Sequence, residues 1–431
     1  MSHWRERLGN SLNLQPGEGP AVAAGLVMFF LLFTGYFMLR PVRETMGIAG
    51  GIDNLQWLFT GTFIATLMCL PLFGWLASRV KRKRILPWTY GFFVSNLMLF
   101  AGLFAVDQQA LWTARAFYIW LSVFNLLAIS LAWSVLADLF STEQGKRLFG
   151  LLAAGASAGG LAGPVLGTLL VAPLGHSGLL LLASLLLLGS IAASAYLLHW
   201  RSQHPLELTA ELPPNKPLGG NPFAGATAVL RSPYLLGIAL FVVLLASVST
   251  FLYFEQARIV SETFIDRTQQ TQVFGLIDSV VQALAILTQL FITGRLARRL
   301  GVGVLLIGVP LLMALGFIWL ALAPTFAVFV GVMVIRRAGE YALVRPGREM
   351  LFTVLPAEAK YKAKSFIDTV VYRGGDALSG WLKRGLDLLG EHPQLAMLIG
   401  AALALSWAGV GGWLGRRQRQ LEQPAQALRA K

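Results

Sequence analysis

The sequence predicts an all-α membrane protein with about twelve transmembrane helices in two six-helix halves and with both termini in the cytoplasm. Its 431 residues are 56% hydrophobic, with a mean hydropathy of +0.64. Charged residues make up 13% of the chain, about half of the roughly 25% that is usual in soluble domains. Apolar stretches long enough to cross a hydrocarbon core of about 30 Å recur along the chain, and the basic residues between them alternate in a regular way.

The apolar stretches define the spans. The first runs from Ala21 to Leu39, which is too long for the apolar core of a cleaved signal peptide, so we expect it to remain as a membrane helix. The predicted spans are residues 21–40, 55–78, 85–106, 112–137, 147–171, 177–199, 233–254, 271–293, 302–322, 325–348, 365–388 and 394–414.

Basic residues in the loops set the orientation. Lysine and arginine collect after every second span, whereas the alternating loops at residues 107–110, 173–177 and 390–394 carry none. Because positively charged loops stay in the cytoplasm, this pattern predicts that both termini are cytoplasmic, in the inner or plasma membrane if the source is bacterial. The basic residues are Arg79, Lys81, Arg82, Lys83, Arg84, Lys146, Arg147, Arg295, Arg298, Arg299, Lys360, Lys362, Lys364, Arg416, Arg417 and Arg419.

A proline-rich polar stretch divides the chain. Residues 201–232 contain five prolines, a density that opposes a continuous helix. We therefore expect an N-terminal six-helix half at residues 1–200, a cytoplasmic linker at 201–232 and a C-terminal six-helix half at 233–431. This organisation leaves no room for a separate soluble catalytic domain.

Several function classes are excluded. The net charge of +14 does not indicate nucleic-acid binding, because the basic residues lie in short loops between apolar spans. The single cysteine, Cys69, excludes an intramolecular disulfide and a cysteine-cluster metal site. We expect no cofactor, metal or enzymatic activity, since no nucleophile–base pair or metal-ligand cluster is visible. The glycines of residues 150–167 predict a close helix-packing face and not a phosphate loop.

Two loops at equivalent places in the two halves have similar sequences. The loop after the second span reads Gly74-Trp-Leu-Ala-Ser-Arg-Val-Lys-Arg-Lys83, and the loop after the eighth reads Gly294-Arg-Leu-Ala-Arg-Arg-Leu-Gly301. Both resemble the glycine-and-arginine loop of the major facilitator superfamily, although Ser78 and Arg298 stand at its usual acidic position. The resemblance implies two related six-span halves and a central cavity lined by spans one, four, seven and ten.

A second repeat links the first and tenth spans. The pattern Tyr36-x-x-x-Arg40-Pro-x-Arg43-Glu44 recurs as Tyr341-x-x-x-Arg345-Pro-x-Arg348-Glu349. Since these two spans run in opposite directions, we expect one cluster near the outer face and the other near the inner face. The outer cluster is predicted to pair with Glu255 and Arg258, and the inner cluster with the loop after span four.

The same segments show a local resemblance to the nucleotide (ATP/ADP) translocase family. It rests on the sequences Leu39–Glu44, Glu143–Phe149, Arg348–Pro356 and Lys362–Asp368, and on Arg373. The resemblance implies that Arg43 and Arg348 occupy positions where basic residues hold substrate phosphates, and that Glu255 matches an acidic position late in span seven.

Charges also interrupt the spans themselves. Arg336 and Arg337 lie about eleven residues into span ten, where each would cost about 2.5–3.5 kcal/mol if it faced lipid. We therefore expect water or acidic partners around them, and Glu340 shares the face of Arg336. The predicted substrate-binding or gating residues are Tyr36, Arg40, Arg43, Glu44, Arg115, Glu255, Arg258, Arg336, Arg337, Glu340, Tyr341, Arg345, Arg348, Glu349, Asp368 and Arg373, with Asp278 and Asp376 as further candidates.

The excess of arginine over acidic residues predicts an anionic substrate, because the planar guanidinium fork matches carboxylate and phosphate. The resulting hypothesis is a secondary active transporter of a small organic anion, working by alternating access through an arginine-rich central cavity. A nucleotide exchanger and a non-transporting membrane sensor or scaffold are the alternatives. We expect a monomer in the lipid bilayer, without nucleic acid, and leave a coupling proton or sodium ion open.

Overall fold

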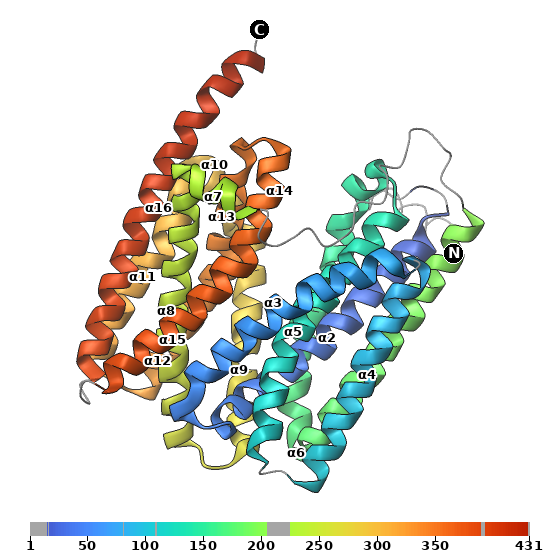
Figure 1. Ribbon diagram of the computed structural model, residues 1–431, viewed down its shortest axis with the longest axis horizontal. Helices are drawn as coiled ribbons and strands as arrows, with labels where there is room; N and C mark the ends of the chain where they lie inside the picture. The colour runs from blue at the N-terminus through green and yellow to red at the C-terminus, as the bar shows by residue number, and fades with distance from the viewer. Residues whose placement is uncertain are drawn as a thin grey trace. The chain divides into compact units, whose positions relative to one another are not determined.

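The computed structural model describes residues 15, 17–80, 82–107, 110–204, 225–388 and 393–429, and within these ranges all regular structure is helical (Figure 1). The segments in chain order are α2 (Gly19–Ala49), η1 (Ile52–Asn54), α3 (Leu55–Arg79), α4 (Arg82–Val106), α5 (Leu111–Leu139), α6 (Thr142–Gln203), α7 (Ala226–Arg231), α8 (Pro233–Thr263), α9 (Arg267–Thr288), η3 (Gln289–Thr293), α10 (Gly294–Leu300), α11 (Val302–Leu322), α12 (Phe326–Gly339), η4 (Glu340–Val344), α13 (Arg345–Leu351), η5 (Phe352–Val354), α14 (Ala357–Phe366), η6 (Ile367–Val371), α15 (Tyr372–Leu388) and α16 (Pro393–Arg429).

Nine helices in the described part of the chain are long and apolar enough to cross a membrane. One of them, α6, contains two of the predicted spans. Gly175, whose backbone is non-helical with a φ of 65°, separates them. Spans ten and eleven correspond to α12–η4–α13 and α14–η6–α15, whose charged residues lower their hydropathy. The helices are therefore consistent with the predicted twelve spans.

Several helices are longer than their apolar cores. Helix α2 continues nine residues beyond the predicted end at Arg40, and α8 and α16 continue to Thr263 and Arg429. The predicted ends were wrong there, because hydropathy detects only the part of a helix that matches the hydrocarbon thickness. Of the predicted linker at 201–232, residues 205–224 lie outside the described residues.

The chain forms two compact units, and each unit includes a segment from the other half of the sequence. The first unit contains Asp266–Ser279 from the start of α9, and the second contains Gly47–Pro71 from α3 and the turn before it. The first unit is Met1–Met46, Leu72–Gly219 and Asp266–Ser279, and the second is Gly47–Pro71, Gly220–Ile265 and Val280–Lys431. The division of the sequence at residues 201–232 remains a prediction.

Glycines of α6 bring this helix against the backbone of α2 in the first unit. A Cβ atom placed on Gly155, Gly159 or Gly163 would lie 2.4–2.7 Å from a carbonyl oxygen of α2. These glycines repeat every four residues, so they lie on one face of the helix. The predicted small-residue packing face is thus present, and it permits the close backbone approach that membrane helices use in place of hydrophobic burial.

The second unit uses the same device between α11 and α16. A Cβ on Gly415 would lie 2.5 Å from the Cα of Gly303, and one on Gly411 would lie 2.8 Å from the carbonyl oxygen of Leu306. Figure 1 shows these two helices side by side along most of their length.

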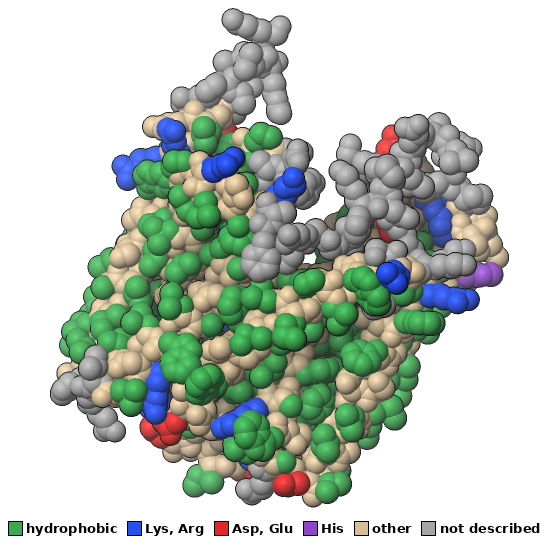
Figure 2. Space-filling model, viewed as in Figure 1, with side chains coloured by type: hydrophobic (Ala, Val, Ile, Leu, Met, Phe, Trp, Pro, Cys, Tyr) green, Lys and Arg blue, Asp and Glu red, His purple; other side chains and the backbone are tan. Residues whose placement is uncertain are grey.

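Large apolar side chains remain exposed on the flanks of many helices. Among them are Trp57, Met68 and Leu72 of α3 and Leu290 of η3, which are each 58–71% exposed. Figure 2 shows hydrophobic side chains spread over most of the visible face, with few charged ones between them. Such a surface fits contact with lipid tails.

We predict that Gly159→Ala lowers the stability of the protein by about 1–3 kcal/mol, the usual cost of overfilling a packed contact. The added methyl group would lie 2.4 Å from the carbonyl oxygen of Phe30. Gly150→Ala is the matched control, because a Cβ there has no neighbour within 4 Å, and alanine favours a helix over glycine. Thermal unfolding of both purified variants checks the prediction, which is contradicted if they melt alike.

Glu18, just before α2, is buried in a set of hydrogen bonds with the start of α6. Arg147 donates to both carboxylate oxygens at 3.2 and 2.9 Å, and Gln144 donates at 2.9 Å. Burial alone would raise the pKa of the Glu18 carboxyl, but the hydrogen bonds from Arg147, from the Gln15 amide and from Gln144 outweigh it and hold the pKa below its ordinary value.

We predict that Glu18 contributes stability that depends on pH. Because its native pKa lies below the unfolded value of about 4.3, the contribution is fully present above that pH and disappears as the pH falls through the native pKa. The difference in melting temperature between wild type and Glu18→Gln should therefore be largest near pH 6 and shrink towards pH 3. A difference that stays constant over this range would rule out the linkage.

Candidate functional site

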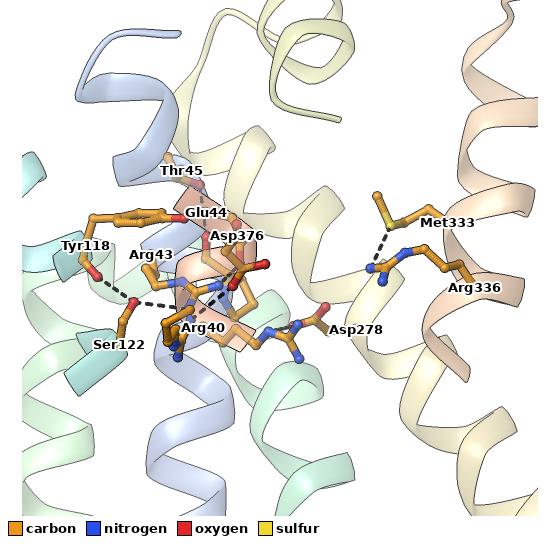
Figure 3. Close-up of polar contacts among 12 residues, drawn as sticks. Arg40, Arg43, Glu44, Thr45, Tyr118, Ser122, Asp278, Met333, Arg336 and Asp376 are labelled. Atoms are coloured by element: carbon orange, nitrogen blue, oxygen red, sulfur yellow. Dashed lines mark hydrogen bonds and ion pairs between the residues drawn. The ribbon is translucent and has the colours of Figure 1, made fainter. Parts of the chain in front are cut away.

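Arg43 on α2 is held by three neighbours in the first unit (Figure 3). It forms an ion pair with Glu44, and it donates to the Ser122 hydroxyl on α5 at 3.4 Å. Its guanidinium also lies 5.2 Å from the ring centroid of Tyr118. A guanidinium over an aromatic face and beside a carboxylate is stabilised without direct exposure to lipid.

Arg40, one turn earlier on α2, faces a helix from the second half of the sequence. Its Nε lies 3.7 Å from Asp278 on α9, within the first unit. The same two helices are linked through the Thr45 and Thr271 hydroxyls at 2.7 Å. Asp278 was a lesser candidate in the sequence, and the structure makes it the carboxylate beside Arg40.

The first unit also contains the predicted residues Arg115 and Tyr36. Arg115 stacks on Trp112 in the first turn of α5, with 4.9 Å between the guanidinium carbon and the ring centroid. Tyr36 is buried, with 7% of its surface exposed.

Span ten, in the second unit, holds three buried charged residues of the predicted set. Arg336, Arg337 and Glu340 are each at most 7% exposed. Arg336 donates to Glu340 at 3.1 Å and to the Ser249 hydroxyl on α8 at 2.7 Å. The acidic partner expected for Arg336 is thus Glu340, and a serine of the neighbouring helix completes the contact.

Glu340 has a second cationic partner. Its other carboxylate oxygen lies 3.5 Å from Arg345, whose side chain is 55% exposed. The Arg345 guanidinium stacks on the Tyr341 ring at 4.5 Å. One buried carboxylate is therefore shared by a buried and an accessible guanidinium, an arrangement in which an incoming anion has a cation to bind without displacing the whole network.

The end of the span-ten cluster pairs with span eleven. Arg348 lies 3.0 Å from Asp368, and Glu349 pairs with Lys364. These contacts join α13 to α14 and η6 within the second unit. Each arginine of the second repeat thus has a carboxylate neighbour, as each arginine of the first repeat does.

Helices α8 and α15 face each other along a polar seam. Ser247 and Ser379 are linked at 2.8 Å, and Thr250 donates to Asp376 at 3.4 Å. Asp376 also lies 3.7 Å from Arg373. The predicted residue Glu255 continues the seam through its ion pairs with Arg258 and with Lys383.

Lys383 is a buried cation that the sequence interpretation missed. It is 4% exposed and lies 3.1 Å from Glu255, with Asp387 as a second partner. A signal was present, because Asp376, Ser379, Lys383 and Asp387 follow each other at three- and four-residue intervals and so share one face of α15. A hydropathy profile averages over all faces of a helix, so it does not show this stripe.

No group of three or more potential metal ligands occurs among the described residues. The polar contacts described above are made by guanidinium, ammonium, carboxylate and hydroxyl groups. Guanidinium groups can form charge-assisted hydrogen bonds to carboxylate or phosphate, and span ten contributes those of Arg336 and Arg345.

Comparison with known proteins identifies the fold. A family model described as Major Facilitator Superfamily matches residues 22–375. Among solved structures, a bacterial homologue of the human lysosomal transporter Spinster, inward-facing and unoccupied, is 14% identical, with 94% of this chain and 98% of that chain covered and a TM-score of 0.60. A bacterial homologue of the iron transporter ferroportin in an inward-facing state is 15% identical, with coverages of 93% and 98% and a TM-score of 0.63.

A third similar structure is a POT family transporter in complex with a thioalcohol-conjugated peptide. It is 13% identical, with 91% of this chain and 96% of that chain covered and a TM-score of 0.65. No curated protein matches the sequence. At these identities the structural similarity establishes the fold, and the resemblance to nucleotide translocases has no counterpart among these matches.

We predict that Lys383→Met destabilises the protein by about 3–5 kcal/mol, because it leaves buried carboxylate charge without one of its cations. The double variant Lys383→Met/Glu255→Gln should lose less stability than the two single variants lose together. A matched control is Arg384→Met, which removes a neighbouring cation whose partner Asp53 is 82% exposed. Thermal unfolding is measured for Lys383→Met, Glu255→Gln, the double variant and Arg384→Met. Additive losses of stability in the double variant would show that Lys383 and Glu255 are not coupled.

Proposed function

Because the chain belongs to the major facilitator superfamily, we propose that this membrane transporter moves a small organic anion by alternating access and binds it at Arg336 and Arg345. The observation that carries the proposal is the sharing of Glu340 by these two arginines. Arg336 is buried in a membrane span, whereas Arg345 is half exposed.

The energetic cost of the cluster supports a binding role. Placing an arginine in the middle of a membrane helix costs about 2.5–3.5 kcal/mol, and a purely structural contact between α8 and α12 could be made without charge. A carboxylate or phosphate that approaches Arg345 meets a guanidinium already oriented by Tyr341 and Glu340. Charge-assisted hydrogen bonds to such a guanidinium are about twice as strong as neutral ones.

Competition gives a route from binding to movement. The anion takes over hydrogen bonds that Glu340 otherwise receives, and the buried carboxylate then needs another partner. A ligand shifts a conformational equilibrium by its difference in affinity for the two states. When the anion replaces Glu340 as the partner of Arg336 and Arg345, the two states of the span differ in their affinity for the anion.

We predict that Arg336→Ala lowers the initial rate of anion uptake into proteoliposomes at least about tenfold, the effect of losing one charge-assisted contact. Arg295→Ala is the matched control, since this exposed arginine donates to the carbonyl oxygen of Phe291 on its own helix. Melting temperature verifies that each variant is folded. Uptake at the wild-type rate by folded Arg336→Ala protein would refute the binding role.

The substrate panel contains labelled monocarboxylates, dicarboxylates and phosphate esters, each with and without pH and sodium gradients. A counterflow assay with labelled ATP and ADP tests the nucleotide hypothesis directly, since the local resemblance would have Arg43 and Arg348 hold substrate phosphates. Flux of uncharged or cationic solutes alone would contradict an anion carrier. Absence of any flux from folded wild-type protein would favour a sensor or scaffold.

A further inference from the structure

Three π-helical turns interrupt the described helices, and all three lie in the second half of the sequence. They are η3 (Gln289–Thr293), η4 (Glu340–Val344) and η6 (Ile367–Val371). Such turns are rare and occur often at functional sites. Two of them, η3 and η4, lie against each other.

The π turn that begins at Glu340 places Arg345 beside the Glu340 carboxylate. The amide of Arg345 donates to the carbonyl oxygen of Glu340, which closes a loop of five residues instead of four. Residues five apart in a regular α-helix are rotated by about 140° around the axis and do not face each other. Glu340 therefore reaches Arg336 four residues before it and Arg345 five residues after it because the helix changes its register between them.

The π turn leaves backbone carbonyl groups in need of donors. Pro346 has no N–H, so it can bond neither the Ala342 carbonyl in an α register nor the Tyr341 carbonyl in a π register. The missing donors come from η3. Gln289 Nε2 donates to the carbonyl oxygen of Tyr341 at 3.0 Å, and the Thr293 hydroxyl donates to that of Ala342 at 2.8 Å.

The hydrogen bond from Thr293 is shorter and more buried than the one from Gln289. Thr293 is 8% exposed, and an unsatisfied buried carbonyl group costs about 1–3 kcal/mol. Its hydroxyl oxygen also lies 3.1 Å from the carbonyl oxygen of Thr288 on its own helix, so the single proton has two acceptors and the shorter contact is the one between the helices.

We propose that Thr293 is a positioning residue for anion binding: it holds the π turn of span ten and thereby keeps Arg345 beside Glu340. Gln289 assists it from the exposed side of the same turn. Thr293 itself does not touch the two arginines. The inference rests on the proposed anion site, because it assigns to Arg345 the accessible half of that site.

The transport test compares three variants. Thr293→Val keeps the shape of the side chain and removes the hydroxyl, so we expect KM for the transported anion to rise about five- to tenfold while the maximal rate stays within about twofold of wild type. Thr293→Ser restores the hydroxyl and should restore KM. Thr288→Val is the control, since it changes a threonine of α9 that makes no side-chain hydrogen bond among the described residues. Equal KM values for Thr293→Val and wild type would overturn the proposal.

A second measurement needs no substrate. Melting temperatures are measured for Glu340→Gln, Arg345→Gln and the double variant, first in wild type and then in a Thr293→Val background. We expect the two changes to be non-additive in wild type and additive with Thr293→Val, while Thr293→Ser preserves the non-additivity. Unchanged non-additivity in the valine background would overturn the role of Thr293, whereas failure of every anion to be transported would overturn the proposed function and leave this result interpretable.

Discussion

Charge in a membrane helix has to be paired, and the pairing of Glu340 with two arginines shows how the fold meets this requirement. An arginine that faced lipid in the middle of a span would cost about 2.5–3.5 kcal/mol. Arg336 avoids this cost through Glu340 and Ser249. The remaining oxygen of Glu340 then holds Arg345, which is accessible. The same interaction that makes the span tolerable in the bilayer therefore leaves Arg345 accessible, where we propose that the anion binds.

Close helix contacts occur in both compact units. Glycines in α6 and α16 let these helices approach the backbones of α2 and α11, so in the first unit close backbone contact holds α2, the helix that carries Arg40 and Arg43. Buried hydroxyl groups act at the next level. The Ser247 hydroxyl bonds that of Ser379, and the Thr293 hydroxyl donates to the Ala342 carbonyl oxygen, so each contact joins two helical segments. Close packing therefore comes from glycines of α6 and α16, whereas the charged contacts of span ten come from other helices.

The two copies of the Tyr-Arg-Pro-Arg-Glu repeat show how one sequence pattern takes two structural forms. In the first copy, α2 runs through Pro41 without a change of register, and Arg40 lies beside Asp278 of another helix. In the second, a π turn precedes Arg345, and the carboxylate comes from the same helix. The difference lies in the neighbours, because Thr293 and Gln289 supply donors to the second copy.

The sequence by itself determined the class of fold, most of the spans, the glycine packing face and the spans that carry charge, because each of these is a local property of composition and spacing. Hydropathy could not find the ends of α2 and α8, and it gave no sign that Lys383 of α15 is buried. The tertiary structure alone decided which carboxylate each arginine meets. Partner choice depends on the rotation of each helix and on its distance from its neighbours. A π turn adds one residue to a helical turn and so changes that rotation, and the pattern of apolar residues in the sequence does not reveal it.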